Sequence, residues 1–339
     1  MNRAAACLLL LACCAHEPPV ISSDDAREAR VWPAPPARPL VRFLGSFPRG
    51  DRAVAPTSFW QRVASLIVGT EPAASRQGPL LERPFAVAAI RGGFIVADPD
   101  GRKVLRVNTN ENRITALECP EHPWKMPLAL AAEPEGQVCV ADGGAGLVLC
   151  LSRDGTCRAI GAAALERPSG LALLAGRIYV ADPPRHQIVA FAPDGRELLR
   201  FGSRGESSGE FNFPSGLGAD ADGTLLVVDA LNFRIVRCSP EGEVLDSFGE
   251  PGDGSGAFGR PKGVATDAAG RIFVSDAQND VVIVFSRMGA FQTAVGGTGA
   301  EAGSLTLPAG VALGDGMLYV ADSYNHRVQI FQLLAGEPP

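Results

Sequence analysis

One pattern recurs six times in this chain and limits the fold more than any other feature. Each copy begins with a proline, continues through apolar, strand-like residues, and ends in an aspartate 14 or 15 positions after the proline. The copies span residues 84–98, 127–142, 168–182, 214–229, 261–276 and 308–322. Successive aspartates are 40 to 47 residues apart. A period in the forties built from strand-like segments indicates a propeller or a repeat array.

The third copy shows how one repeat forms a sheet. Apolar segments at 170–174, 177–181, 188–191 and 198–201 are separated by short turns, one of them marked by Pro193-Asp194-Gly195. We therefore predict an all-β fold, a six-bladed β-propeller of four-stranded antiparallel blades. Three loops between repeats share one spacing of glycines and a large apolar residue, which we expect to fill the crevice between blades. These apolar residues are Phe211, Phe258 and Leu305.

The sixth repeat ends near Phe331 with only three strand-like segments. The missing strand is predicted at the other end of the chain, because residues 40–45 resemble the fourth strand at 198–202. We expect this N-terminal strand to complete the last blade as its outer strand. Closing the ring in this way removes the exposed strand edges of an open array. The predicted propeller domain therefore covers residues 40–334.

The repeats resemble NHL repeats across residues 84–331. The resemblance lies in the Pro-x-Gly-(Val/Leu)-Ala opening and in an Asp-x-x-Asn-x-Arg element, best preserved at 322–328 and 229–235. The other copies depart from this element. Gly101, Ala145 and Arg185 replace the Asn, and Leu147, Gln187 and Val281 replace the Arg. The resemblance implies a six-bladed propeller, and the chain looks most like bacterial six-bladed propeller lipoproteins, a group whose activity is mostly undefined.

The N-terminus has the pattern of a targeting segment. Residues 1–12 combine one positive charge with a short apolar stretch, as in a signal peptide. Leu10-Leu11-Ala12-Cys13 resembles a bacterial lipobox, which implies lipidation of Cys13. One alternative is that Cys14 is the modified residue, and another is an ordinary secretory signal that is cut near Ala15. We expect residues 13–39, rich in Pro, Ala and charge, to tether the domain. The expected location is the cell envelope, lipid-anchored to a bacterial membrane facing the periplasm or exterior, with no other membrane contact.

A long insertion precedes the first repeat. Gly45 and Pro84 enclose 38 residues, and residues 57–68 within them have the start, stop and apolar spacing of a helix. Its apolar face either packs over one mouth of the propeller or docks a partner or a membrane. The candidate partner-binding residues on this face are Phe59, Trp60, Val63 and Ile67.

Catalytic and metal-binding signals are absent from the sequence, so we predict no catalytic residues, no metal and no cofactor. His186 and His326 lie in repeats on opposite sides of the ring, whereas zinc catalysis needs about three converging ligands. This argues against a zinc lyase of the peptide-amidating type. The six repeat aspartates form a circle too wide to share one ion, and we expect each to cap a local turn by accepting backbone N–H groups. They are Asp98, Asp142, Asp182, Asp229, Asp276 and Asp322.

Cysteines gather in the second repeat. Strand spacing brings Cys150 opposite either Cys157 or Cys139, and an exported protein permits a disulfide. Cys119 and Cys238 lie elsewhere, the pairing stays open, and buried free thiols are the alternative. No CxxC motif is present, so redox chemistry and haem attachment lack support.

These features favour a monomeric, exported binding or scaffold module for a protein, peptide or glycan partner. The alternative is a metal-dependent propeller enzyme, a lyase or lactonase, with its site at the central channel; the fold alone does not decide between them. Nucleic acid is not an expected partner. The net charge of −6 and the lack of basic clusters do not suit binding to a phosphate backbone.

Overall fold

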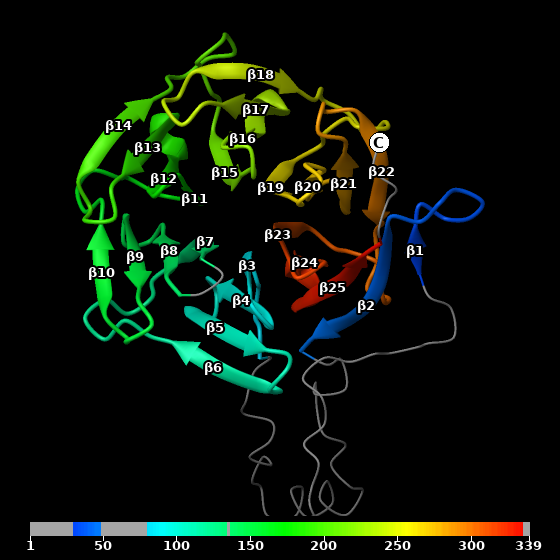
Figure 1. Ribbon diagram of the computed structural model, residues 1–339, viewed down its shortest axis with the longest axis horizontal. Helices are drawn as coiled ribbons and strands as arrows, with labels where there is room; N and C mark the ends of the chain where they lie inside the picture. The colour runs from blue at the N-terminus through cyan, green and yellow to red at the C-terminus, as the bar shows by residue number, and fades with distance from the viewer. Residues whose placement is uncertain (1–29, 49–79, 134–135, 335–339) are drawn as a thin grey trace, which may run out of the picture.

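The computed structural model describes residues 30–48, 80–133 and 136–334, and it shows six blades arranged in a ring (Figure 1). Each blade is an antiparallel sheet of four strands, from an innermost first strand to an outer fourth strand, and one blade carries a short fifth strand outside its fourth (Figure 1). Consecutive first strands contact one another around the ring. The predicted all-β, six-bladed propeller is therefore confirmed.

The first five blades follow the repeats in chain order. Blade 1 contains β3 (Ala86–Ile90), β4 (Gly93–Asp98), β5 (Lys103–Asn108) and β6 (Arg113–Leu117). Blade 2 contains β7 (Pro127–Ala132), β8 (Val138–Asp142), β9 (Leu147–Leu151) and β10 (Cys157–Ile160). Blade 3 contains β11 (Gly170–Leu174), β12 (Arg177–Asp182), β13 (Gln187–Phe191) and β14 (Glu197–Phe201). Blade 4 contains β15 (Pro214–Ala219), β16 (Leu225–Asp229), β17 (Arg234–Cys238) and β18 (Val244–Phe248). Blade 5 contains β19 (Pro261–Thr266), β20 (Ile272–Asp276), β21 (Val281–Phe285) and β22 (Phe291–Gly296).

Blade 6 is assembled from both ends of the chain. Its inner strands are β23 (Pro308–Gly314), β24 (Met317–Asp322) and β25 (Arg327–Leu333), and its fourth strand is β2 (Val41–Phe47). β2 pairs antiparallel with β25, as predicted, and Phe43 lies opposite Phe331. A short additional strand, β1 (Val31–Trp32), pairs with β2 and comes from the segment predicted to be a tether. The Trp32 ring packs edge-on against Phe331, with centroids 5.7 Å apart, so ordered structure begins before residue 40.

The hydrophobic core lies between blades. Six buried clusters fill the six interfaces between neighbouring blades. Phe211, Phe258 and Leu305, the residues predicted to fill the crevices, are fully buried in three of these clusters. Burying a side chain of this size contributes about 1.5–3 kcal/mol, so the loops between blades also hold adjacent blades together.

The first strands approach one another closely around the channel. An ideal Cβ at Gly216 in β15 would lie 2.3 Å from the carbonyl oxygen of Lys262 in β19. No side chain fits at that distance, so glycine is required for this contact. The close approach sets the width of the channel and the positions of the residues that line it.

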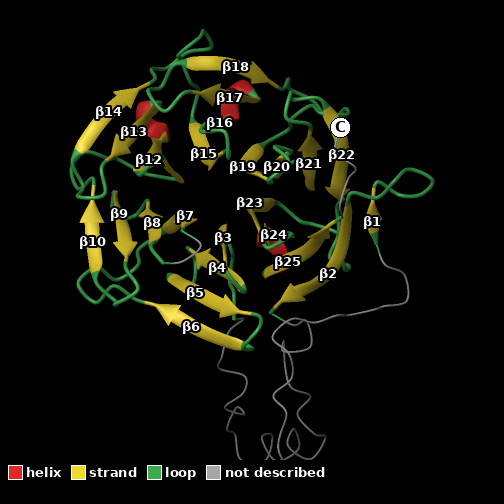
Figure 2. Ribbon diagram, in the orientation of Figure 1, coloured by secondary structure: helices red, strands yellow, loops and turns green. Residues whose placement is uncertain are grey.

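Helical structure in the described residues is limited to three single 3₁₀ turns, seen in red in Figure 2. They are η3 (Pro183–Arg185), η4 (Ala230–Asn232) and η5 (Ser323–Asn325), each directly after a repeat aspartate. None of these helices is long enough to cross a membrane. The helix predicted at 57–68, the signal peptide and Cys13 lie outside the described residues.

Candidate functional site at the channel mouth

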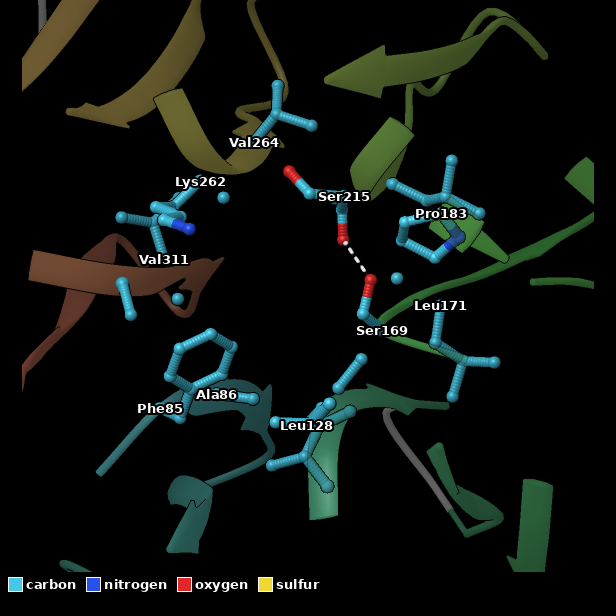
Figure 3. Close-up of a pocket in the computed structure, with 18 of the residues that line it drawn as sticks. Phe85, Ala86, Leu128, Ser169, Leu171, Pro183, Ser215, Lys262, Val264 and Val311 are labelled. Atoms are coloured by element: carbon cyan, nitrogen blue, oxygen red, sulfur yellow. Dashed lines mark hydrogen bonds between the residues drawn. The ribbon is translucent and has the colours of Figure 1, made fainter. Parts of the chain in front are cut away.

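A cavity of about 470 Å³ lies at the end of the channel where the six first strands begin (Figure 3). All six blades contribute to its lining. We call this cavity the channel mouth. Its walls follow the repeat, because each blade presents the residue directly after its repeat proline and every blade except blade 6 also presents the residue directly before it.

The residue directly after the repeat proline forms a ring inside the channel mouth. In blade order these residues are Phe85, Leu128, Ser169, Ser215, Lys262 and Ala309. The three polar members belong to the consecutive blades 3, 4 and 5, and the three apolar members belong to blades 6, 1 and 2. The ring is therefore divided into one polar half and one apolar half, which face each other in Figure 3.

The residue directly before the repeat proline forms the outer rim. In blade order these residues are Arg83, Met126, Arg167, Phe213, Arg260 and Leu307, and all except Leu307 line the cavity. Arginine thus occupies blades 1, 3 and 5, and an apolar residue occupies blades 2, 4 and 6. The structure gives a backbone reason for part of this alternation.

In blades 1, 2, 3 and 5 the repeat aspartate holds two consecutive backbone N–H groups of the rim. In blade 1, Asp98 is fully buried and accepts hydrogen bonds from the N–H of Glu82 at 2.6 Å and of Arg83 at 3.0 Å. Asp142, Asp182 and Asp276 bind the equivalent pairs. These carboxylates link the second strand of each blade to the residue that presents its side chain at the rim.

Blades 4 and 6 contain the complete Asn and Arg pair of the NHL-like element, and their aspartates are bound differently. Asp229 accepts one backbone N–H, from Asn212 at 2.6 Å. Its second oxygen accepts Nδ2 of Asn232 and Nε of Arg234, both at 2.8 Å. Asp322 in blade 6 has the equivalent partners. Both carboxylates are fully buried.

In these two blades the backbone N–H of the rim residue donates its hydrogen bond to a side chain of the preceding blade, and not to the repeat aspartate of its own blade. The N–H of Phe213 donates to Nδ1 of His186 at 3.2 Å, and the N–H of Leu307 donates to Oδ1 of Asp280 at 2.7 Å. Both rim residues have a positive φ, 62° for Phe213 and 48° for Leu307. The four copies that depart from the NHL-like element thus share the geometry in which the repeat aspartate binds two backbone N–H groups of the rim.

The rim arginines differ in whether a carboxylate neutralises their charge. Arg83 forms a two-pronged ion pair with Asp100, with both N–O distances 2.7 Å. The hydrogen bonds to Asp100 raise the pKa of Arg83, and those from Arg83 lower the pKa of Asp100. Arg167 and Arg260 are exposed, and neither side chain has an ion pair within the described ranges.

Lys262 projects into the channel mouth from blade 5 and is half-buried. It forms no ion pair with any residue that the structure describes. Burial, and then the charge of Arg260, lower the pKa of the Lys262 amine to about 8. The lysine is one of only three in the chain, with Lys103 and Lys125, so its chemistry can be followed individually.

Because the neutral amine is the reactive form, we expect acetylation of Lys262 by an N-hydroxysuccinimide ester to reach half its maximal rate near pH 8. The measurement is peptide mass spectrometry after short pulses of reagent from pH 6 to 10, with free Nα-acetyl-lysine as the reference for reagent reactivity. A rate that continues to rise with free lysine up to pH 10 would show that the channel mouth does not lower this pKa.

Two serines complete the polar half. The Ser169 hydroxyl donates to the backbone carbonyl of Ser215 at 3.1 Å, the dashed line in Figure 3. The Ser215 hydroxyl oxygen is buried and has no hydrogen-bond partner among the residues that the structure describes. A buried hydroxyl without a partner costs about 1–3 kcal/mol, so a ligand atom that bonded to Ser215 would recover this energy.

The channel mouth has an unusual donor set for a metal site. Its lining residues include no carboxylate, imidazole or thiol, and all four ionisable ones are cations. Nowhere in the described ranges do three His, Cys, Asp or Glu side chains group around a possible ion. His186 and His326 do not line the cavity; the first accepts the Phe213 N–H, and Nδ1 of the second contacts the Glu82 carbonyl oxygen.

Two disulfides lie in and beside blade 2. Cys139 and Cys150, directly opposite on β8 and β9, are bonded, which is one of the pairings left open by the sequence. Cys157 pairs with Cys119 in the loop before blade 2, and not with Cys150. Cys238 is a buried free thiol, and burial raises its pKa to about 12.

Sequence reasoning missed the two rings of the channel mouth. The two rings could have been found from the residues directly before and directly after the six repeat prolines, whose pattern is visible once the copies are aligned. The residues proposed from the sequence as partner-binding, Phe59, Trp60, Val63 and Ile67, lie outside the described residues.

Comparisons with known proteins agree with the fold. Residues 305–331 match the NHL repeat model. Virginiamycin B lyase from Staphylococcus aureus superposes with a TM-score of 0.57 at 14% identity, covering 75% of this chain and 96% of that one. A gluconolactonase from Xanthomonas campestris gives 0.58 at 17%, covering 75% and 87%. An auxiliary nutrient binding protein from Bacteroides thetaiotaomicron gives 0.59 at 8%, covering 74% and 69%. No curated protein matches the sequence.

Proposed function

We propose that this protein is a binding module that holds an anionic ligand in the channel mouth. The observation behind the proposal is that every ionisable residue lining the cavity is a cation, in a chain whose net charge is −6. Arginine and lysine form strong, charge-assisted hydrogen bonds to carboxylate and phosphate groups. A cavity of about 470 Å³ falls in the usual size range of small-molecule sites.

A peptide or glycan with an acidic group, belonging to a larger partner or free, is the ligand class that fits this proposal. The structural neighbours include two enzymes and a nutrient binding protein, and at 8–17% identity they share the fold alone. A metal-dependent lyase or lactonase is less well supported, because protein sites hold divalent cations mainly through carboxylate, imidazole or thiolate groups, and the residues that line this cavity have none.

We expect the double variant Arg167→Gln/Arg260→Gln to lose most of the stabilisation by anionic ligands. A ligand at about 100 times its Kd adds about 2.7 kcal/mol to stability. For a domain of this size that raises Tm by roughly 4–5 °C. Thermal unfolding with acidic peptides and acidic saccharides, each beside its neutral amide or ester, measures the effect.

Arg196→Gln, which changes an exposed arginine on an outer turn, is the matched control and should respond like the unmodified protein. Equal stabilisation of the double variant and the control by acidic ligands would contradict a site at the channel mouth. Stabilisation by the neutral ligands alone would contradict the anionic class.

We also propose that the module is exported and lipid-anchored through Cys13. The two disulfides support this location, because such bonds persist mainly outside the reducing cytosol. In a bacterial host, Cys13→Ser is expected to move the protein from the membrane to the soluble fraction, since a multiply acylated cysteine anchors firmly. Cys14→Ser is the control. Retention of the Cys13→Ser protein in the detergent phase after Triton X-114 partition would contradict the assignment.

A further inference from the structure

The division of the channel mouth into a polar and an apolar half restricts the class of ligand further. The post-proline ring places Ser169, Ser215 and Lys262 in three consecutive blades. The Ser169 proton is already donated to a backbone carbonyl, whereas the Ser215 hydroxyl and the Lys262 ammonium have no acceptor among the described residues. The Lys262 ammonium thus lines the cavity without a partner, and the unpartnered Ser215 hydroxyl lies just beneath the wall of the adjacent blade. One carboxylate group has enough lone pairs to accept from both donors once a small rotation of Ser215 brings its hydroxyl to the surface.

The opposite side of the same ring offers no hydrogen bonds. Phe85 and Leu128 project their side chains into the cavity from blades 1 and 2 (Figure 3). Ala309 completes this half, with Val311 behind it. An apolar group placed here leaves water and gains about 25 cal/mol for each Å² it buries. A purely ionic ligand would leave these apolar side chains in contact with water and would gain nothing from them.

The rim repeats the division. Arg167 and Arg260 stand above the polar half, in the blades on either side of Ser215, and Phe213 lies between them in blade 4. Above the apolar half the single cation is Arg83, which Asp100 already neutralises. The unneutralised positive charge of the channel mouth therefore lies on one side only.

We propose that the channel mouth recognises a carboxylate attached to an apolar body, with the carboxylate against Lys262 and Ser215 and the apolar body against Phe85 and Leu128. This inference rests on the proposed function, since it specifies the ligand of that same site. The shared chemistry occurs in a free aryl or branched-chain acid and at the carboxyl end of a peptide that finishes in an apolar residue. Polyanions and neutral apolar molecules each satisfy only half of the site.

Isothermal titration of the full chain tests both halves. The probes are N-acetyl-phenylalanine, its amide and acetate, followed by a tetrapeptide ending in phenylalanine with a free or an amidated carboxyl end. We expect N-acetyl-phenylalanine to bind at least about 10-fold more tightly than its amide, the difference made by one charge-assisted hydrogen bond. It should also bind at least about 10-fold more tightly than acetate, which has the carboxylate but no apolar body to bury. Stronger binding of the tetrapeptide than of the free acid identifies a peptide end as the source, and the reverse identifies a small acid.

Two variants test which half of the ring binds which part of the ligand. Lys262→Met should reduce the affinity for N-acetyl-phenylalanine to that of the amide, while Lys125→Met, at an exposed lysine that does not line the cavity, should not. Phe85→Ala should weaken acid and amide alike. Unchanged Tm values show that the variants fold. Equal binding of acid and amide, or of N-acetyl-phenylalanine and acetate, would overturn the inference. If other acidic ligands bind in an Arg167- and Arg260-dependent way while these probes do not, the inference fails and the proposed function stands.

Discussion

Replacing Asp322 with alanine is expected to lower the free energy of unfolding by about 3–5 kcal/mol, because it leaves buried donors without an acceptor. Asp322 is fully buried and accepts hydrogen bonds from the Thr306 N–H, Nε of Arg327 and Nε2 of Gln329, each at 2.8 Å. Nδ2 of Asn325 is also bound. The carboxylate thus joins the second strand, the third strand and the entry loop of blade 6.

Urea denaturation followed by tryptophan fluorescence measures this loss. Asp253→Ala, at an exposed aspartate in a loop between blades, is the matched control and should change stability by less than about 0.5 kcal/mol. If Asp322→Ala behaved like the control, the repeat aspartates would contribute little to blade assembly. Their presence in all six repeats would then need another explanation.

Removing the disulfide between Cys119 and Cys157 is the second large expected effect. The bond closes a loop with a sequence separation of 38, and Cys119 is buried. Chain-entropy arithmetic gives a stabilisation of about 4 kcal/mol for such a loop and about 3 kcal/mol for the separation of 11 between Cys139 and Cys150. We expect Cys119→Ser/Cys157→Ser to be the less stable of the two double variants.

The comparison is made by urea denaturation of both double variants, with and without dithiothreitol. The reductant should lower the stability of the unmodified protein more than that of either variant, because each variant has only one disulfide to lose. Equal stability of the Cys119→Ser/Cys157→Ser variant and the unmodified protein, under non-reducing conditions, would rule out this bond as a stabilising link.

Much of the fold followed from the sequence because the relevant interactions are local. The turn at Pro193-Asp194-Gly195 and the alternation of β11 to β14 depend on neighbours in the chain, so strand positions in blade 3 were predicted to within a residue or two. Cys139 and Cys150 could be paired as candidates for the same reason, since they face each other across one hairpin. Even β2 was found, because it repeats the pattern of β14.

The site was less accessible to sequence reasoning. Whether Lys262 faces the channel or a neighbouring blade depends on how closely β15 and β19 approach, which Gly216 determines in three dimensions. Cys119 was not paired because it lies in a loop whose path depends on two blades. The copies without the Asn and Arg pair looked degraded in sequence. In the structure their aspartates bind a second backbone N–H instead.

The closure of blade 6 has a consequence for biosynthesis. β2 lies far ahead of its partner β25 in the sequence and leaves the ribosome well before it, although Phe43 and Phe331 pair across the two strands in the folded protein. The edge of β2 that binds β25 therefore has no partner until β25 has been made, and only the two-residue strand β1 can pair with β2 before then. Contacts this distant in sequence make folding slow, and an unpaired strand is an aggregation hazard meanwhile. Export of the unfolded chain before β25 emerges would postpone ring formation to the far side of the membrane, where the disulfides of blade 2 can also form.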